Sequence, residues 1–416
     1  MFNIEIFQKI KKKIFPFYKN KDLKFVFKKL QEDSSNQSIP AKFVGGCVRK
    51  YLSNEDIDDI DIATSLTTDK IKEKFKDTKF KVIESGIKHG TVTLVKNKLK
   101  LELTTLRRDI KTDGRHAEIE FTDNWLEDSK RRDLTINAIY LDINGKIYDY
   151  HDGARDLKTN VVKFIGDPNT RIQEDYLRII RFLRFAIQYD SNTDAQTIEA
   201  LKLNLNGIKN ISKERVLEEL LKILKLNNFH NILKHKNKKI IFSLIFPELI
   251  NVNKLEKLKY FKKSLDKNLI LTILLLDNAN NHEYFCHKYK VSNKMKEEIS
   301  LLIKLHNESR SHKDFLDNNI KKNIYFYGTK IMKNLAILKY FIKSKNNLDD
   351  LNKIIKKIEK LSIPKFPYDG SYLKKKGVKE GLFMGKILKK MENEWLNNEF
   401  KISDEVILKI IKNQDN

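Results

Sequence analysis

A glycine pair followed by an Asp-x-Asp pair places the strongest constraint on what this chain can fold into. The run 44–49, VGGCVR, contains Gly45 and Gly46, and the acidic pair begins ten residues after Arg49. Backbone N–H groups at paired glycines can approach a bound anion, and Arg49 adds a planar guanidinium suited to phosphate. Two carboxylates at i and i+2 of a strand point the same way and can hold a metal ion together. The two motifs therefore predict a strand, a turn and a helix around a site for metal-assisted transfer from a nucleoside triphosphate.

The acidic run 54–61, NEDIDDID, contains two Asp-x-Asp pairs, of which the second is Asp59 and Asp61. On a strand these two carboxylates share one face while the alternating isoleucines face a core, so the first pair is assigned to the approach loop. Glu102 lies between leucines in the predicted strand 99–105 and is a candidate third carboxylate, with an exposed edge position as the alternative. Hard oxygen ligands favour Mg²⁺. Two such ions would activate an attacking hydroxyl and neutralise the leaving pyrophosphate.

A basic segment further along the chain supplies a second motif. It spans residues 130–138, KRRDLTINA, and contains Arg132, Asp133 and Asn137. Guanidinium, carboxylate and amide groups at this spacing suit contacts to a triphosphate and to ribose hydroxyls. Taken alone, a solvated charge run explains the segment equally well.

The third motif lies in the segment 172–189, whose apolar residues recur at helical spacing and predict a single helix. Asp175, Arg178, Arg181 and Arg184 follow one another at intervals of three residues on that helix. One interpretation is an ion pair between Asp175 and Arg178. The other is a protein template for a nucleobase, in which the carboxylate accepts from an exocyclic amine and the guanidinium donates to the adjacent ring nitrogen. Such a template would select cytosine and adenine, because uracil and guanine present a carbonyl in place of the amine, and Arg181 and Arg184 would then reach the phosphates.

The balance of charge indicates the kind of partner. The chain carries 82 Lys and Arg against 56 Asp and Glu, a formal net charge of +26. An excess of this size favours a polyanionic partner such as nucleic acid, with a general abundance of Lys and Asn as the alternative. Cys47 and Cys286 are too few for a disulfide framework and predict a reducing cytoplasm. No apolar run approaches the length of a transmembrane span, so no membrane partner is expected.

In this order the motifs resemble those of the class II tRNA nucleotidyltransferases, the family of bacterial CCA-adding enzymes and poly(A) polymerases. The resemblance covers at least residues 40–250 and rests on the segments 44–64, 101–109, 131–138 and 166–186. It implies an α+β nucleotidyltransferase head with a five-stranded mixed sheet, followed by an all-α neck, body and tail. The expected boundaries are an N-terminal basic helix at 1–22, a catalytic head at 23–160, a base-recognising neck at 161–250, and a tRNA-binding body and tail at 251–416.

The resemblance also implies roles for particular residues. Asp59 and Asp61 would bind Mg²⁺, and Glu102 would complete the catalytic carboxylates. Together with the residue chemistry above, it predicts nucleotide contacts at Gly45, Gly46, Arg49, Arg132, Asp133, Asn137, Asp175, Arg178, Arg181 and Arg184. The implied reaction adds C, C and A to the 3′ end of tRNA from CTP and ATP, without a nucleic-acid template and with release of pyrophosphate.

Several questions stay open at the level of sequence. Lys50 stands where the family usually has Asp, which leaves the orientation of Arg49 undefined. The polar segment 107–116 is predicted to be a mobile loop. A poly(A) polymerase, an enzyme that adds only CC or only A, and an inactive RNA-binding protein are the alternatives. A basic Gly-Arg-Arg-Phe segment typical of bacterial poly(A) polymerases does not occur, which favours CCA addition. Monomer and homodimer are both open.

Overall fold

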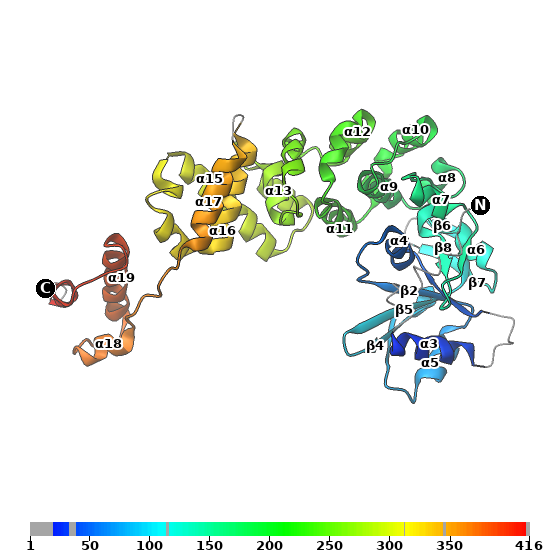
Figure 1. Cartoon of the computed structure of the whole chain (residues 1–416), viewed down its shortest axis with the longest axis horizontal. Coiled ribbons are helices and arrows are strands. Elements are labelled where there is room, and N and C mark those ends of the chain that lie inside the picture. The colour runs from blue at the N-terminus through cyan, green and yellow to red at the C-terminus, as the bar shows by residue number, and fades with distance from the viewer. Residues whose placement is uncertain (1–19, 33–38, 114–115, 312, 344–346, 413–416) are drawn as a thin grey trace. The chain divides into compact units, whose positions relative to one another are not determined.

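The computed structural model of the chain describes residues 20–32, 39–113, 116–311, 313–343 and 347–412. These residues form two compact units, of which the first ends at Ser292 and the second begins at Asn293. The first unit contains a mixed α/β head and the helices that follow it, whereas the second is all helical (Figure 1). Most of the predicted basic helix at 1–22 lies outside the described residues.

A mixed sheet of seven strands forms the centre of the head (Figure 1). In spatial order its strands are β3 (Lys81–Gly86), β4 (Thr91–Lys96), β5 (Leu99–Thr105), β2 (Ile60–Thr64), β1 (Ala41–Val44), β8 (Ile139–Leu141) and β9 (Ile147–Asp149). Strands β2 and β5 are parallel, and the other described pairs of this sheet are antiparallel. The expectation of five strands is wrong because short or irregular strands extend both edges. Strands β8 and β9 have three residues each, and β3 shifts register against β4.

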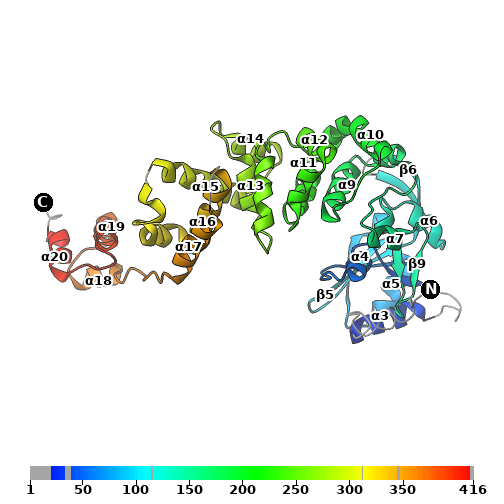
Figure 2. The same ribbon diagram turned by 45° about the horizontal axis from the view of Figure 1, so that its top comes forward.

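Alternation along β1 and β2 separates the two faces of this sheet. Phe43 pairs with Ile62, and the Phe43 ring packs 4.6 Å from the ring of Phe27 in α3 (Lys21–Gln31). Val44 and Ala63 project from the opposite face and share a second apolar cluster. Helix α3 lies beside α5 (Thr68–Phe75), and α4 (Gly46–Ser53) lies beside α7 (Gly153–Lys158) on the other side of the sheet (Figures 1 and 2).

Local sequence patterns predict two hairpins of this unit and miss a third. Alternating apolar residues with a turn at 96–98 predict a hairpin over 91–105, and Asn144-Gly145 predicts another over 138–149. Both are present, as β4–β5 and β8–β9. The described residues of the segment 107–116, predicted as a loop, instead belong to a separate two-stranded antiparallel sheet. Its strands are β6 (Arg107–Asp113) and β7 (His116–Phe121), and α6 (Trp125–Lys130) follows. Pairing satisfies the backbone groups of a segment whose side chains alone predict no strand.

Helices complete the first unit. They are α8 (Pro168–Glu174), α9 (Leu177–Gln188), α10 (Ala195–Leu203), η3 (Leu205–Asn210), α11 (Lys213–Leu224), η4 (Phe229–Lys234), α12 (Lys236–Ile245), η5 (Val252–Tyr260), α13 (Lys267–Leu275) and α14 (Asn281–Lys288). The prediction of one helix across 172–189 is wrong at one point. Asp175 has extended backbone angles, φ −156° and ψ 106°, and separates α8 from α9.

The second unit is built from six α-helices and one 3-10 helix among the described residues. They are α15 (Asn293–Ser311), η6 (Lys313–Leu316), α16 (Ile320–Ile342), α17 (Leu348–Lys360), α18 (Gly370–Lys375), α19 (Leu382–Asn397) and α20 (Asp404–Lys412). The last three pack around a cluster formed by Leu373, Met384, Ile387, Met391 and Ile407. Over the described part of the chain, no helix is long and apolar enough to cross a membrane.

Candidate active site

Strands β2 and β5 bring two of the candidate carboxylates side by side. Asp61 pairs with Glu102 in the register of these parallel strands, so both side chains project from the same face of the sheet. Alternation in the acidic run predicts a strand over 57–62, but β2 begins at Ile60, so Asp59 lies just before this strand. Burial, followed by the neighbouring Glu102 carboxylate, raises the pKa of Asp61 to about 6. The three carboxylates therefore concentrate negative charge, an arrangement that a bound cation would relieve.

The carboxylates of Asp59 and Asp61 suit a metal ion that takes only some of its ligands from the protein. Among the described residues, no group of three or more His, Cys, Asp or Glu side chains is arranged to hold a metal. Glu102 is instead paired with Lys100 at 2.6 Å. Asp59 and Asp61 would thus supply part of a coordination sphere and leave the other positions to phosphate oxygens and water, as Mg²⁺ prefers.

Gly45 forms the turn between β1 and α4. Its φ of +70° lies in the region that favours glycine, and a Cβ there would stand 3.7 Å from Oδ2 of Asp61. Helix α4 begins at Gly46, where a Cβ would meet nothing within 4 Å. The backbone at the two glycines therefore passes close to the carboxylates and leaves open space beside a helix N-terminus, a combination suited to an anion.

Lys50, the residue that departs from the family pattern, forms an ion pair with Asp58. The hydrogen bond from Lys50 lowers the pKa of the Asp58 carboxyl. This ion pair joins α4 to the loop that precedes β2, so Lys50 acts on the approach to Asp59 and not on Arg49.

Arg49 is oriented by side chains from other elements. Its guanidinium donates to Oδ1 of Asn137 in η2 (Thr135–Asn137) and, at 3.1 Å, to the hydroxyl of Tyr189. Asn137 in turn donates to Asp133 at 2.9 Å, and Asp133 accepts from Arg181 at 2.7 Å. Burial opposes the charge on Asp133, but Arg181 and the Asn137 hydrogen bond hold the pKa of this carboxyl below its usual range. A continuous chain of hydrogen bonds therefore joins α4 to α9 through η2.

Arg131 and Arg132 are anchored by Asp128 of α6. Asp128 is fully buried and accepts from Arg131 at 2.8 Å, from Arg132 at 3.0 Å and from the Tyr140 hydroxyl at 2.7 Å. Burial opposes the charge on Asp128, but Arg132 and Arg131 hold its pKa below the usual range. This basic segment is therefore a folded ion-pair network and not a solvated charge run.

An ion pair between Asp175 and Arg178, one of the two interpretations of the third motif, does not form because both side chains have other partners. Asp175 accepts from Arg215 of α11 at 2.7 Å and from the backbone N–H of Leu177 at 3.1 Å. Arg178 pairs with Glu174 of α8. The physical reason is the helix break, because extended backbone at Asp175 removes the i to i+3 geometry on which the prediction rested.

Helix α11 contributes three charged side chains that sequence reasoning did not single out. Arg215 holds Asp175, while Glu219 accepts from Arg184 at 2.8 Å and lies 3.7 Å from Arg181. Lys222 pairs with Glu219 at 3.0 Å. The three lie at positions i, i+4 and i+7 of the helix, which places them on one face. This spacing is the sequence signal that could have identified them.

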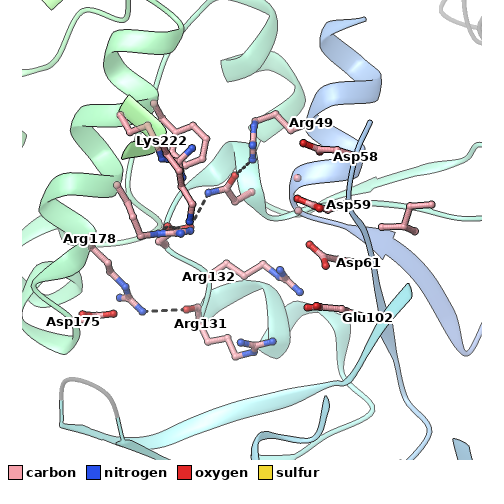
Figure 3. A pocket seen from close by; sticks show the side chains of 18 of the residues that line it. Arg49, Asp58, Asp59, Asp61, Glu102, Arg131, Arg132, Asp175, Arg178 and Lys222 are labelled. Atoms are coloured by element: carbon pink, nitrogen blue, oxygen red, sulfur yellow. Dashed lines mark hydrogen bonds and ion pairs between the residues drawn. The ribbon is translucent and has the colours of Figure 1, made fainter. Parts of the chain in front are cut away.

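All thirteen residues predicted from sequence line one pocket of about 750 Å³, together with Asp58, Ile60, Lys100, Arg131, Phe185 and Lys222. Figure 3 shows Asp59, Asp61 and Glu102 along one side and Asp175 with Arg178 on the other. Arg132 extends between them toward the carboxylates. The pocket can therefore hold a polyanion between its arginines and a cation bound to the carboxylates. On the side opposite the carboxylates, Asp175 and Arg178 can form hydrogen bonds with a base.

Comparisons with known proteins point to one family. Residues 41–163 match the family described as poly A polymerase head domain, and residues 192–252 match the one described as probable RNA and SrmB-binding site of polymerase A. CCA tRNA nucleotidyltransferase 1, mitochondrial, of Homo sapiens is 32% identical over 404 residues, which are 92% of this chain and 89% of that protein. The CCA-adding enzyme of Staphylococcus aureus strain MSSA476 is 32% identical over 316 residues, 75% of this chain and 76% of that protein.

The fold agrees with these sequence relationships. The crystal structure of the Bacillus stearothermophilus CCA-adding enzyme in complex with CTP matches with a TM-score of 0.72 at 21% identity, over 94% of this chain and 96% of that chain. The head domain match and the relatives at 31–32% identity identify the chain as a nucleotidyltransferase. The chain belongs to the family of CCA tRNA nucleotidyltransferases and poly(A) polymerases.

Proposed function

We propose that the protein adds C, C and A to the 3′ end of tRNA, using CTP and ATP. The observation that carries this proposal is that Asp175 and Arg178 line the same pocket as Asp59 and Asp61. A pair able to select a base thus lies in the same pocket as a pair able to support phosphoryl chemistry. The names of relatives at 31–32% identity over most of this chain support the same reaction.

The placement of the charged groups in the pocket supports this reaction. The terminal ribose hydroxyl of the RNA attacks the α-phosphate, a phosphodiester bond forms, the α–β anhydride breaks, and pyrophosphate and the hydroxyl proton leave. The backbone at Gly45 and Gly46 would receive phosphate oxygens, while Arg49, Arg132 and Arg181 face the negative charge that develops on the leaving group. Because these guanidinium groups are already held by neighbours, little reorganisation accompanies the chemical step.

Mg²⁺ is the proposed cofactor. Asp59 and Asp61 would hold two Mg²⁺ ions together with the substrate phosphates. When bound, it lowers the pKa of the attacking hydroxyl and neutralises the leaving pyrophosphate. The raised pKa of Asp61 supports this assignment, since a carboxylate crowded by burial and by Glu102 gains from a cation.

Base selection is assigned to Asp175 and Arg178. Asp175 would accept a hydrogen bond from the exocyclic amine of cytosine or adenine, and Arg178 would donate to the adjacent ring nitrogen. Arg215 and Glu174 hold the two side chains in place, so the pair is set before a base arrives.

The remaining proposals assign each step to a part of the chain and the protein to a compartment. We assign transfer to residues 23–160, base recognition to 161–250 and tRNA binding to 251–416. The net charge of +26 favours a polyanionic partner in addition to the nucleotide. Both cysteines are buried free thiols, which supports a reducing compartment. The cytoplasm remains a prediction, since the relatives from Homo sapiens and Danio rerio are named mitochondrial.

Asp59→Ala tests the catalytic assignment. Transfer of CMP to a tRNA that lacks its 3′ end should fall by at least about 10²-fold, the scale for losing one group that stabilises transition-state charge. Binding of tRNA, measured by gel shift, should stay near the wild-type value. The matched control is Asp56→Ala, an exposed residue of the same acidic run that does not line the pocket. Retained transfer in Asp59→Ala would refute the metal assignment.

A further inference from the structure

The break between α8 and α9 contains an aromatic ring packed directly on a glycine. Tyr176 follows Asp175 and caps the N-terminus of α9. Its ring lies against Gly207 of η3, where an added Cβ would come closer than 3.0 Å to the ring atoms Cγ, Cδ1 and Cε1. Carbon atoms in folded proteins do not approach one another this closely, so any side chain at position 207 must displace the ring.

The segment that carries Gly207 is tied down on both sides of this contact. Asn204 donates to Asn169 of α8 at 2.7 Å, and the Gly207 N–H donates to the carbonyl of Asn204 at 3.0 Å. Eight residues beyond Gly207, Arg215 donates to Asp175 at 2.7 Å. Asn204, just before η3, is held against α8, and α11, just after η3, is held against Asp175. Because the chain is fixed on both sides of η3, this 3-10 helix cannot easily withdraw from an enlarged side chain.

The first turn of α9 is built on the two residues at the break. The Arg178 N–H donates to the carbonyl of Asp175 at 2.9 Å, and the Ile179 N–H donates to the carbonyl of Tyr176 at 3.1 Å. Displacement of the Tyr176 ring would therefore turn the peptide between Asp175 and Tyr176 and carry both base-selecting side chains with it.

We infer that Gly207 and Tyr176 are positioning residues for base selection, an inference that rests on the function proposed above. Neither residue lines the pocket, so both act through Asp175 and Arg178. The arginine proposed to face phosphate, Arg181, is held by Asp133 and not by Tyr176 or Gly207. Disturbing the ring should therefore relax the choice of base more than it weakens contact with the triphosphate.

The experiment compares Gly207→Ala with wild type in single additions of CMP and UMP to a tRNA that lacks its 3′ end. The ratio of kcat/KM for CTP to that for UTP should fall by about tenfold or more, since a misplacement of 1 Å can cost about 10²-fold in rate. The control is Asn206→Ala, an exposed position of the same 3-10 helix, which should leave the ratio unchanged.

Tyr176→Ala is a second test of the inference, because it removes the ring without adding a side chain at position 207. It should lower the ratio as well, and adding Gly207→Ala to it should have little further effect, because the ring that clashes is gone. An unchanged ratio in Tyr176→Ala, or equal losses for both nucleotides in Gly207→Ala, would overturn the inference. Wild-type protein that uses UTP as readily as CTP would instead contradict the proposed function itself.

Discussion

Arg49 and Arg181 come from different helices, yet Asn137 and Asp133 join them into one hydrogen-bonded chain. A guanidinium that is already oriented loses less conformational entropy when it binds phosphate. The two guanidinium groups are therefore preorganised to receive the triphosphate of the proposed reaction. In that proposal, discrimination between bases depends on Asp175 and Arg178 at the other side of the pocket.

Asp175→Asn is the sharpest residue-scale test of that discrimination. The amide keeps the size of the carboxylate but can donate an N–H to the uracil carbonyl that the carboxylate would repel. The ratio of kcat/KM for CTP to that for UTP should fall by about tenfold or more, in line with the 1–3 kcal/mol that a good base contact provides. Steady-state kinetics with each nucleotide measure it, and Asp56→Asn is the control. A ratio that stays at the wild-type value would contradict the base template.

At the scale of elements, Asp128 joins α6 to the sheet. Its carboxylate is buried among Arg131, Arg132 and the Tyr140 hydroxyl, and it also accepts from the backbone N–H of Arg107 at the start of β6. The position of α6, the two arginines and the β6–β7 hairpin therefore depend on one buried charge.

Asp128→Ala should lower the free energy of unfolding of the head by about 3–5 kcal/mol, because it leaves buried guanidinium groups without their partner. Urea denaturation followed by Trp125 fluorescence, in a Trp395→Phe background, measures the loss. The exposed Asp123→Ala is the control and should change stability by less than about 0.5 kcal/mol. A loss below about 1 kcal/mol in Asp128→Ala would contradict the anchoring role.

The same variant has a defined pH dependence. The folded-state pKa of Asp128 lies below its usual value, so its stabilising effect is fully present above about pH 4 and is lost as the pH falls through the lower, folded-state pKa. Wild type and Asp128→Ala should thus converge in stability under acid conditions. A difference that stayed constant into strong acid would contradict the assignment of charge to this carboxyl.

Local patterns predict some elements and miss others for physical reasons. The hairpins at 91–105 and 138–149 follow from alternation and short turns. Alternation predicts Asp61 on a strand, but it places Asp59 on the same strand, whereas β2 begins only at Ile60. The break at Asp175 was missed because the apolar periodicity of α9 continues across it, whereas Arg215, which holds Asp175, lies forty residues away. Asp128 could not be identified from sequence because it lies just before the basic segment, and its role depends on its burial among Arg131, Arg132 and Tyr140.

At the scale of the whole molecule, charge is the dominant feature. The net charge of +26 includes a group of exposed lysines on and around α18 and α19: Lys375, Lys376, Lys379 and Lys386. A surface of this kind gains affinity for RNA by releasing counterions, and that gain falls with added salt.

Neutralising Lys375, Lys376 and Lys386 together to Gln should weaken tRNA binding and flatten its salt dependence. Each lost phosphate contact should reduce the slope of log K against log salt by about 0.7 to 0.9. Filter binding at several salt concentrations gives both quantities. The control is Lys28→Gln, Lys70→Gln and Lys76→Gln, which removes the same charge from exposed positions on and next to α3 and α5. Equal slopes for wild type and the α18–α19 variant would mean that these lysines do not contact tRNA.

The length of the extended tRNA shows whether one protein adds all three nucleotides. Purified protein is incubated with Mg²⁺ and a tRNA that lacks its 3′ CCA, with CTP, with ATP, or with both. We predict extension by CC with CTP alone, no extension with ATP alone, and extension by CCA followed by a stop when both are present. Long A tails from ATP alone, or a product that ends at CC when both nucleotides are present, would contradict the account.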